Sequence, residues 1–208
     1  MELLLASNNA KKLAELVRLL GPLGIEIRTP ADIGGLADVD EDQPDFRGNA
    51  AKKAQAAARA TGLWSLADDS GLEVECLGGA PGVLSARYAG EHGDDAANNA
   101  RLLRELADQP PEGRGARFVC ALALSAPDGT LCLECQGTAG GQILSEPRGD
   151  GDFGYDPLFL FTEEGHPQTG RGFAELSPAE KSAVSHRGRA LRQLADQLPS
   201  VVQGSAQP

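Results

Sequence analysis

Apolar positions near the start of the chain form one short run and then a helical repeat. Residues 3–6 are apolar, and leucines and a valine then recur at helical spacing over 13–20 before Gly21. This pattern predicts a strand, a polar turn and a helix. It next predicts a strand over 25–29, an irregular acidic stretch over 32–48, a helix over 49–61 and a strand over 63–67 that enters a turn at Asp68-Asp69.

The remaining elements continue the alternation. They are a strand over 72–77, a helix over 94–107, a hairpin of 117–125 and 130–137, strands over 140–144 and 157–161, and a helix from Ser177. That last helix begins with an N-cap serine, then Pro178, and has Glu180 three residues after the cap. Because strands and helices interleave, the sequence predicts an α/β fold with a mixed sheet.

Length and composition predict one domain over residues 1–208, with one core or two closely joined lobes and a flexible tail from about residue 200. The Pro/Gly-rich stretches 78–82 and 147–154 are short and are expected to be loops. The apolar run at 3–6 is too short for a signal peptide or a membrane span, so we expect a soluble cytoplasmic protein.

Charge and cysteine content exclude two classes of site. The formal net charge of −11 argues against a nucleic-acid surface, although a small anion can still bind where a few cations converge. The four cysteines are expected to be reduced. Cys132 and Cys135 lie three apart on a predicted strand, so they point to opposite faces and are poorly placed for a metal or a redox pair.

The turn between the first strand and the first helix is the first candidate site. It has the sequence Ser7-Asn8-Asn9-Ala10-Lys11-Lys12. A helix start presents unpaired N–H groups, and two lysines there suit phosphate oxygens. The alternative is an ordinary helix cap with solvated lysines, which is favoured when the turn is considered alone.

The second candidate is Ala67-Asp68-Asp69-Ser70-Gly71-Leu72. Two adjacent carboxylates repel each other by about 4 kcal/mol at ~4 Å near a protein surface, and a divalent cation removes that conflict. Mg²⁺ prefers carboxylates, water and substrate phosphates, and Glu41 in the acidic stretch is an available second ligand. The alternative, an Asx-type turn that only reverses the chain, is equally favoured at this point.

A third candidate is the segment Gly151-Asp152-Phe153-Gly154-Tyr155-Asp156-Pro157. A flat ring beside an acid that accepts from base N–H groups would suit a nucleobase, whereas the alternative is a strand-entry turn with core aromatics. Only 4% of the residues are aromatic, and their concentration here favours function slightly.

The fourth candidate runs from Lys181 to Arg187 and includes His186. On an unbroken helix Lys181 and His186 diverge by roughly 140°, so both cannot easily reach one ligand. Either the helix breaks near Ser185, or only one of the two residues acts. An isolated histidine is more often structural, and the spacing alone favours that alternative for His186.

Together these four stretches resemble the inosine triphosphate pyrophosphatase family, the Ham1-like proteins, along nearly the whole chain. The family's motifs appear in order as Ser7, Asn9 and Lys12; 67–72; 77–82; 85–88; 153–157; 175–181; and 185–187. The chain departs from the family at Asp152, where a glycine is usual, and in the unusually acidic stretch after Glu41. Because Asp40, Glu41 and Asp42 are consecutive, the choice of Glu41 depends on its distance before Asn49-Ala50.

The resemblance implies an elongated central sheet flanked by helices, two lobes with the active-site cleft between them, and a homodimer. It implies Asp69 as the catalytic base and a Mg²⁺ ligand, Glu41 as the other metal ligand, and Ser70 on the substrate. The triphosphate would bind at Ser7, Asn8, Asn9, Ala10, Lys11 and Lys12. The base and sugar-phosphate would bind at Phe153, Gly154, Tyr155, Asp156, Lys181, His186 and Arg187.

The implied reaction is the hydrolysis of inosine, deoxyinosine and xanthosine triphosphates to monophosphate and pyrophosphate, which would clean the nucleotide pool. His186 and Arg187 would donate hydrogen bonds to the 6-keto oxygen, which a 6-amino purine lacks. The alternatives are a related pyrophosphatase for other modified nucleotides and a nucleotide-sensing module without turnover.

Overall fold

The computed structural model describes residues 2–21, 24–150 and 153–204. Within it the chain divides into two compact units. Unit 1 comprises Met1–Asp69, Cys120–Gly137 and Ala190–Pro208, and unit 2 comprises Ser70–Val119 and Thr138–Arg189. Gly151 and Asp152 of the third candidate, and part of the expected tail, 205–208, lie outside the described residues.

The described residues form one sheet with the strand order β2-β1-β3-β4-β5-β6. The strands are β1 (Glu2–Leu5), β2 (Glu26–Arg28), β3 (Trp64–Val74), β4 (Gly115–Ser125), β5 (Leu131–Ile143) and β6 (Phe159–Phe161). β1 pairs in parallel with β2 and β3, whereas β5 pairs antiparallel with β6. The prediction of an α/β fold with a mixed sheet is therefore confirmed.

The helices are α1 (Ala10–Leu20), α2 (Phe46–Thr61), α3 (Asp95–Glu105), α4 (Pro178–Val184) and α5 (His186–Gly204). Side chains cap the N-termini of α1, α2, α3 and α4. α2 begins three residues before its predicted start because Asp45 caps it, its side chain accepting from the N–H of Gly48 at 2.8 Å. Gly62 ends α2 in a left-handed conformation. No helix of the described ranges is both long and apolar enough to cross a membrane.

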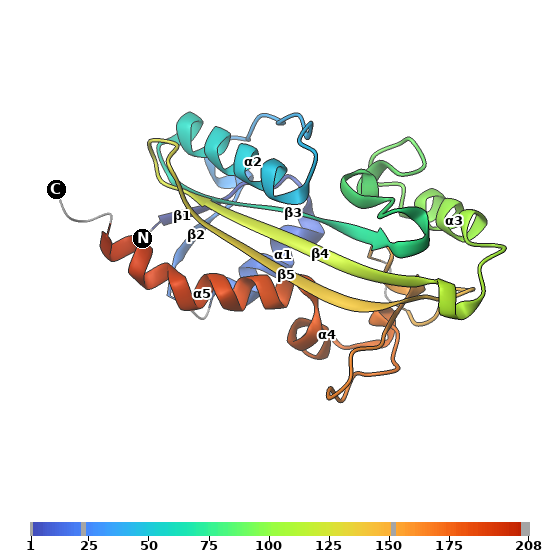
Figure 1. Ribbon diagram of the computed structural model, residues 1–208. Coiled ribbons are helices and arrows are strands. Elements are labelled where there is room, and N and C mark those ends of the chain that lie inside the picture. The colour runs from blue at the N-terminus through green and yellow to red at the C-terminus, as the bar shows by residue number, and fades with distance from the viewer. Residues whose placement is uncertain (1, 22–23, 151–152, 205–208) are drawn as a thin grey trace. The chain divides into compact units, whose positions relative to one another are not determined.

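The two units have different cores. In unit 1, α1 and α5 bury leucines against β1, β3 and β4, and α2 lies on the opposite face of these strands from α5 (Figure 1). The core of unit 2 is aromatic, since it contains Tyr88, Phe118, Tyr155, Phe159, Phe161 and Phe173. The one tryptophan, Trp64, packs in unit 1.

The predicted turn at Asp68-Asp69 is wrong, because β3 runs without interruption from Trp64 to Val74. Gly71 therefore does not reverse the chain. A Cβ on Gly71 would lie 2.3 Å from Ser85 Oγ and 2.7 Å from Gly82 O, so glycine is needed there for close packing. Ser85 Oγ in turn accepts from the N–H of Leu72 at 2.9 Å.

The two strands predicted over 130–137 and 140–144 are one strand, β5. Its glycines allow close approach and do not interrupt it. A Cβ on Gly141 would lie 2.3 Å from Leu160 O of β6. The predicted hairpin of β4 and β5 is confirmed, with its turn closed by the Ala126 N–H donating to Thr130 O at 2.9 Å.

The helix that begins after Ser177 breaks at Ser185, which confirms one of the two predicted alternatives. Ser185 has φ −69° and ψ 155°, an extended conformation that ends α4 before α5 begins at His186. The predicted N-terminal cap is also present, since Glu180 N–H donates to Ser177 Oγ and Ser177 N–H to Glu180 Oε2.

The cysteines form no disulfide within the described residues. On β5, Cys135 is buried while Cys132 is partly exposed, as expected for two positions on opposite faces of a strand. The structure gives no support to a shared metal or redox role for this pair.

Candidate active site

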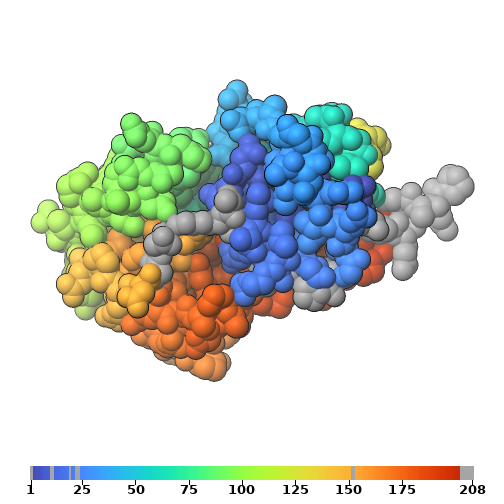
Figure 2. All heavy atoms as spheres, turned by 180° about the vertical axis from the view of Figure 1, so that it is seen from behind, coloured from blue at the N-terminus to red at the C-terminus, as the bar shows by residue number. Residues whose placement is uncertain are grey.

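The turn between β1 and α1 is a helix cap. Asn9 Oδ1 accepts from the backbone N–H of Lys12 at 3.0 Å, and the N–H of Asn9 donates to Ser7 Oγ at 3.3 Å. Asn8 points the other way and donates to Asp38 Oδ1 at 2.9 Å. The segments that carry Asn8 and Asp38, drawn in blue, lie side by side on the face shown in Figure 2. The side chains of Ala10 and Lys11 lie outside the described residues.

Asp68 is the more deeply buried member of the acidic pair. Its side chain is 1% exposed, and Oδ2 lies 3.1 Å from the ammonium of Lys12. Lys12 therefore extends from the first turn of α1 to β3, and the turn 7–12 and the acidic pair are neighbours within unit 1. The sequence motifs assign Asp68 no role of its own, whereas in the structure it forms an ion pair with Lys12.

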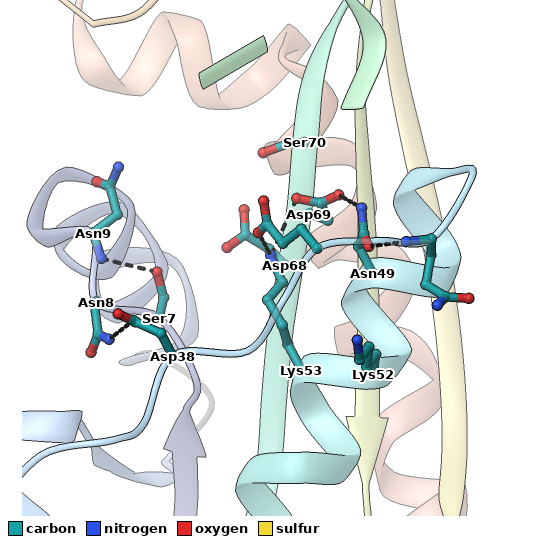
Figure 3. A network of polar contacts seen from close by, with 12 residues as sticks. Ser7, Asn8, Asn9, Asp38, Asn49, Lys52, Lys53, Asp68, Asp69 and Ser70 are labelled. Carbon is teal, nitrogen blue, oxygen red and sulfur yellow. Dashed lines mark hydrogen bonds and ion pairs between the residues drawn. The ribbon is translucent and has the colours of Figure 1, made fainter. Parts of the chain in front are cut away.

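Asp69 lies next to it on β3 and contacts α2 (Figure 3). Its Oδ2 accepts from Asn49 Nδ2 at 3.1 Å, and its Oδ1 lies 3.2 Å from Lys53 Nζ. Asn49 and Lys53 are four residues apart, so both side chains leave the same face of the helix. α2 thus supplies one neutral and one charged donor to a single carboxylate.

Glu41 also reaches Lys53. Its Oε1 lies 2.7 Å from Lys53 Nζ, so one ammonium joins the carboxylates of Glu41 and Asp69. The loop that carries Glu41 is held by Asn49, whose Oδ1 accepts from the Gln43 N–H at 3.0 Å, and by Lys52, whose Nζ donates to Asp40 O at 2.9 Å. The oxygens of Glu41 and Asp69 therefore converge on one cation position.

Burial and charge act in opposite directions on this cluster. Burial raises the pKa of Asp69 above its usual value, and the carboxylate of Glu41 adds to this, while Lys53, Lys12 and Asn49 lower it. Burial lowers the pKa of Lys53, but the carboxylates of Asp69, Asp68 and Glu41 outweigh it, so the pKa of Lys53 is raised. Lys53 consequently remains a cation at neutral pH.

In unit 2 the segment from Phe153 to Asp156 lies beside Lys181. Asp156, 4% exposed, forms an ion pair with the Lys181 ammonium, which also lies 5.1 Å from the centre of the Phe153 ring. Tyr155 is buried, and its hydroxyl donates to Ser85 O at 2.9 Å. Phe153 is thus the more exposed ring of this segment, and Tyr155 belongs to the core.

The first residues of α5 lie close to the same segment. The guanidinium carbon of Arg187 lies 5.9 Å from the centre of the Phe153 ring, and Nη2 donates to Ser70 Oγ at 2.9 Å. Because the helix breaks at Ser185, Lys181 and Arg187 can both approach Phe153. The imidazole of His186 stacks on Phe118 with the ring centres 4.7 Å apart and the planes within 12°.

The residues predicted from the sequence therefore fall into two groups. Unit 1 holds the turn 7–12 with Glu41, Asp68 and Asp69, and unit 2 holds Ser70, 153–156, Lys181, His186 and Arg187. Sequence reasoning did not include Asn49 or Lys53 among the site residues. Their four-residue spacing on a predicted helix places them on one face, but it does not indicate that this face meets Asp69.

Comparisons with known proteins agree with these motifs. The Ham1 family model matches residues 3–197. The chain is 52% identical over 206 residues to the dITP/XTP pyrophosphatase of Mycobacterium tuberculosis, with 98% of each chain covered. It is 50% identical over 211 residues to the protein of the same name from Corynebacterium efficiens, with 100% of each covered.

Solved structures give the same result. The Ham1 protein of Staphylococcus aureus has a TM-score of 0.83 at 36% identity, covering 96% of this chain and 99% of that one. The nucleoside-triphosphatase or dITP/XTP pyrophosphatase of Mycobacterium abscessus has a TM-score of 0.74 at 49% identity, with 93% and 98% covered.

Proposed function

Since the chain belongs to the Ham1 family, we propose that it hydrolyses non-canonical purine nucleoside triphosphates to the monophosphate and pyrophosphate. The proposed substrates are ITP, dITP and XTP, and the cellular role is removal of these nucleotides from the pool. Relatives about half identical over the whole chain carry the name dITP/XTP pyrophosphatase, which supports the substrate class. The observation that carries the chemistry is the buried Asp69 carboxylate between Asn49 and Lys53.

In this proposal Asp69 accepts a proton from water, and the oxygen of that water forms a bond to the α-phosphorus. The bond from the α-phosphorus to the bridging oxygen breaks, and pyrophosphate leaves with that oxygen. Burial favours this role, because it raises the pKa of Asp69 and makes the carboxylate a stronger base than it is in water. The ammonium groups of Lys12 and Lys53 are suited to stabilising the negative charge of the phosphates.

We propose Mg²⁺ as the cofactor, with Asp69 and Glu41 as its protein ligands. The donor set fits, because two carboxylates already converge on one cation, the Lys53 ammonium. No group of three histidine, cysteine or acidic side chains suited to a metal is found in the described part of the chain, so the remaining ligands would be phosphate oxygens and water. When bound, the ion would neutralise charge on the pyrophosphate leaving group.

Base recognition is assigned to unit 2. Phe153 offers a partly exposed ring for stacking, and the guanidinium of Arg187 and the imidazole of His186 offer donors for a 6-keto oxygen. A 6-amino purine would bring its own donor against these donors and would be rejected. Ser70 links the two groups along the chain, since it follows Asp69 directly on β3 and accepts from Arg187.

We also propose that the enzyme is a homodimer and acts in the cytoplasm, where nucleotide pools are used. Sedimentation analysis at micromolar concentration tests the first point, since a monomer at all concentrations would contradict it. Fractionation of cells tests the proposed cytoplasmic location.

The test of the function is pyrophosphate release from a panel of purine and pyrimidine triphosphates, with Mg²⁺ and with a chelator. We expect ITP, dITP and XTP to be the best substrates, hydrolysis to stop on chelation, and Asp69→Asn to be nearly inactive. A preference for a pyrimidine triphosphate would instead support the related pyrophosphatase. Tight binding of ITP without release of pyrophosphate would support the nucleotide-sensing module.

A further inference from the structure

Helix α3 holds the backbone of the segment that carries Phe153. The N–H of Gly154 donates to Asp95 Oδ2 at 2.9 Å, and the carbonyl of Gly154 accepts from Asn99 Nδ2 at 2.9 Å. Asp95 and Asn99 are four residues apart on α3 and so share one face of the helix. Both polar groups of one residue's backbone are thus bound by consecutive turns of one helix.

Gly154, the residue held by these two hydrogen bonds, adopts a backbone conformation that other residues rarely take. Gly154 has φ +56°, in the left-handed region, where glycine is at no steric disadvantage. The turn around it is closed by the N–H of Asp156 donating to Phe153 O at 3.1 Å. Fixing Gly154 therefore fixes the direction in which Phe153 leaves the turn and the place of Asp156 beside Lys181.

α3 is itself firmly attached within unit 2, so it can serve as a fixed support. Asn98 accepts from the Ala89 N–H at 2.7 Å, and Leu102 is fully buried in the aromatic core. Arg101 stacks over the Tyr88 ring at 4.2 Å. Asn98 and Arg101 contact the segment before α3, whereas the side chains of Asp95 and Asn99 form their hydrogen bonds with Gly154 in the described part of the chain. Asn98, Arg101 and Leu102 therefore hold α3 independently of these two side chains.

We propose that Asp95 and Asn99 are positioning residues that set the nucleobase-stacking ring of Phe153 and the neighbouring Asp156. The inference rests on the proposed function, because it assigns these two side chains to base recognition by the same site. They touch no substrate and take no part in the transfer of the proton or the phosphoryl group. Their loss consequently weakens recognition of the base and leaves the hydrolytic step intact.

The test compares a substrate that has a base with one that lacks it. For Asn99→Ala we expect the KM for ITP to rise about three- to tenfold, the range produced by losing one hydrogen bond, with kcat within about twofold. The ratio of kcat/KM for ITP to kcat/KM for ATP should decrease. Hydrolysis of ribose 5′-triphosphate, which has no base, should keep its kcat/KM within about twofold.

Asp95 provides a matched pair of variants. Asp95→Ala should behave like Asn99→Ala, while Asp95→Asn keeps an acceptor for the Gly154 N–H and should restore most of the parent KM. Arg104→Ala removes an exposed side chain from the same helix and should leave all values unchanged. An equal loss of kcat/KM with ITP and with ribose 5′-triphosphate, or no loss of kcat/KM with ITP, would overturn the proposal.

A readout independent of activity separates this inference from the function. Amide hydrogen exchange at Gly154, followed by NMR, should be faster in Asp95→Ala than in the parent chain and near normal in Asp95→Asn. If the parent chain fails to hydrolyse ITP, the proposed function is wrong and exchange decides the positioning role. Unchanged exchange in Asp95→Ala would then overturn it.

Discussion

Asn49 on α2 donates from Nδ2 to Asp69 Oδ2 over 3.1 Å, and its Oδ1 accepts from the backbone N–H of Gln43 over 3.0 Å. One buried amide, 1% exposed, therefore connects the acid on β3 to the loop that carries Glu41. Its two ends differ in kind, because one donates to a carboxylate and the other accepts from the backbone. A substitution can therefore remove the donor and keep the acceptor.

Asn49→Asp keeps the shape of the side chain and the acceptor for Gln43 but loses the donor to Asp69. We expect kcat to fall about 10- to 100-fold, because a hydrogen bond to a charged group is lost and a like charge is added. Gln43→Ala, which keeps the backbone N–H, should change kcat less than about twofold. Steady-state kinetics on both variants checks this, and parent-like turnover by Asn49→Asp would contradict it.

Adjacent lysines on α2 should differ greatly in importance. Lys53→Met removes the ammonium shared by Glu41 and Asp69, so hydrolysis should fall about 100-fold, the order of loss when one group that stabilises developing charge is removed. Lys52→Met removes the hydrogen bond to Asp40 O and an exposed pair with Asp42, which is worth about 0.2–1 kcal/mol, and should reduce hydrolysis less than about fivefold. Similar losses in the two variants, measured with ITP, would show that Lys53 acts only by holding the loop.

Lys12 and Asp68 should be coupled in stability. Lys12→Met leaves a buried carboxylate without its nearest ammonium and should lower the free energy of unfolding by about 3 kcal/mol. Adding Asp68→Asn to that variant removes the charge and should recover part of the loss. Urea unfolding of the parent, the two single variants and the double variant measures the coupling. If the changes in unfolding free energy of the two single variants add up to that of the double variant, the interaction between Lys12 and Asp68 does not stabilise the fold.

The pH dependence of stability should include a contribution from Glu163. Burial raises the pKa of this carboxyl, but hydrogen bonds from Arg189 and the Gly140 N–H outweigh burial, so the pKa in the folded protein is below 4.5. A depressed pKa means that the stabilisation is complete above pH 4.5 and is lost as the pH falls through the folded value. The unfolding free energy of Glu163→Gln should therefore vary less with pH below about pH 5. If the unfolding free energies of the parent chain and Glu163→Gln change with pH in parallel, Glu163 makes no such contribution.

Local sequence signals predicted the helices well, but they failed where glycine is needed for packing. At Asp68-Asp69 and Gly71 a turn was predicted, because these residues are poor strand formers. Tertiary packing overrides that preference, since Leu66, Leu72 and Val74 are buried and Gly71 must admit Ser85. No pattern in the neighbouring residues reveals that approach.

The need for glycine at Gly141 on β5 could not be predicted either, because it arises from close packing against the backbone of Leu160. The break at Ser185 could be predicted as an alternative, since helix geometry alone separates Lys181 from His186. The partners of Asp69 could not be predicted in this way. Asn49 and Lys53 reach Asp69 only because β3 and α2 pack together. The spacing of residues along the chain does not predict that packing.

The unequal distribution of aromatic residues gives each unit its own spectroscopic signal. Trp64 belongs to unit 1, while Tyr88 and Tyr155 belong to unit 2. Fluorescence excited at the red edge of the spectrum arises from the indole alone and so follows unit 1, whereas the near-ultraviolet dichroism also includes the tyrosines of unit 2. Denaturation curves recorded with the two signals will coincide if the molecule melts as a single cooperative block and will separate if it does not.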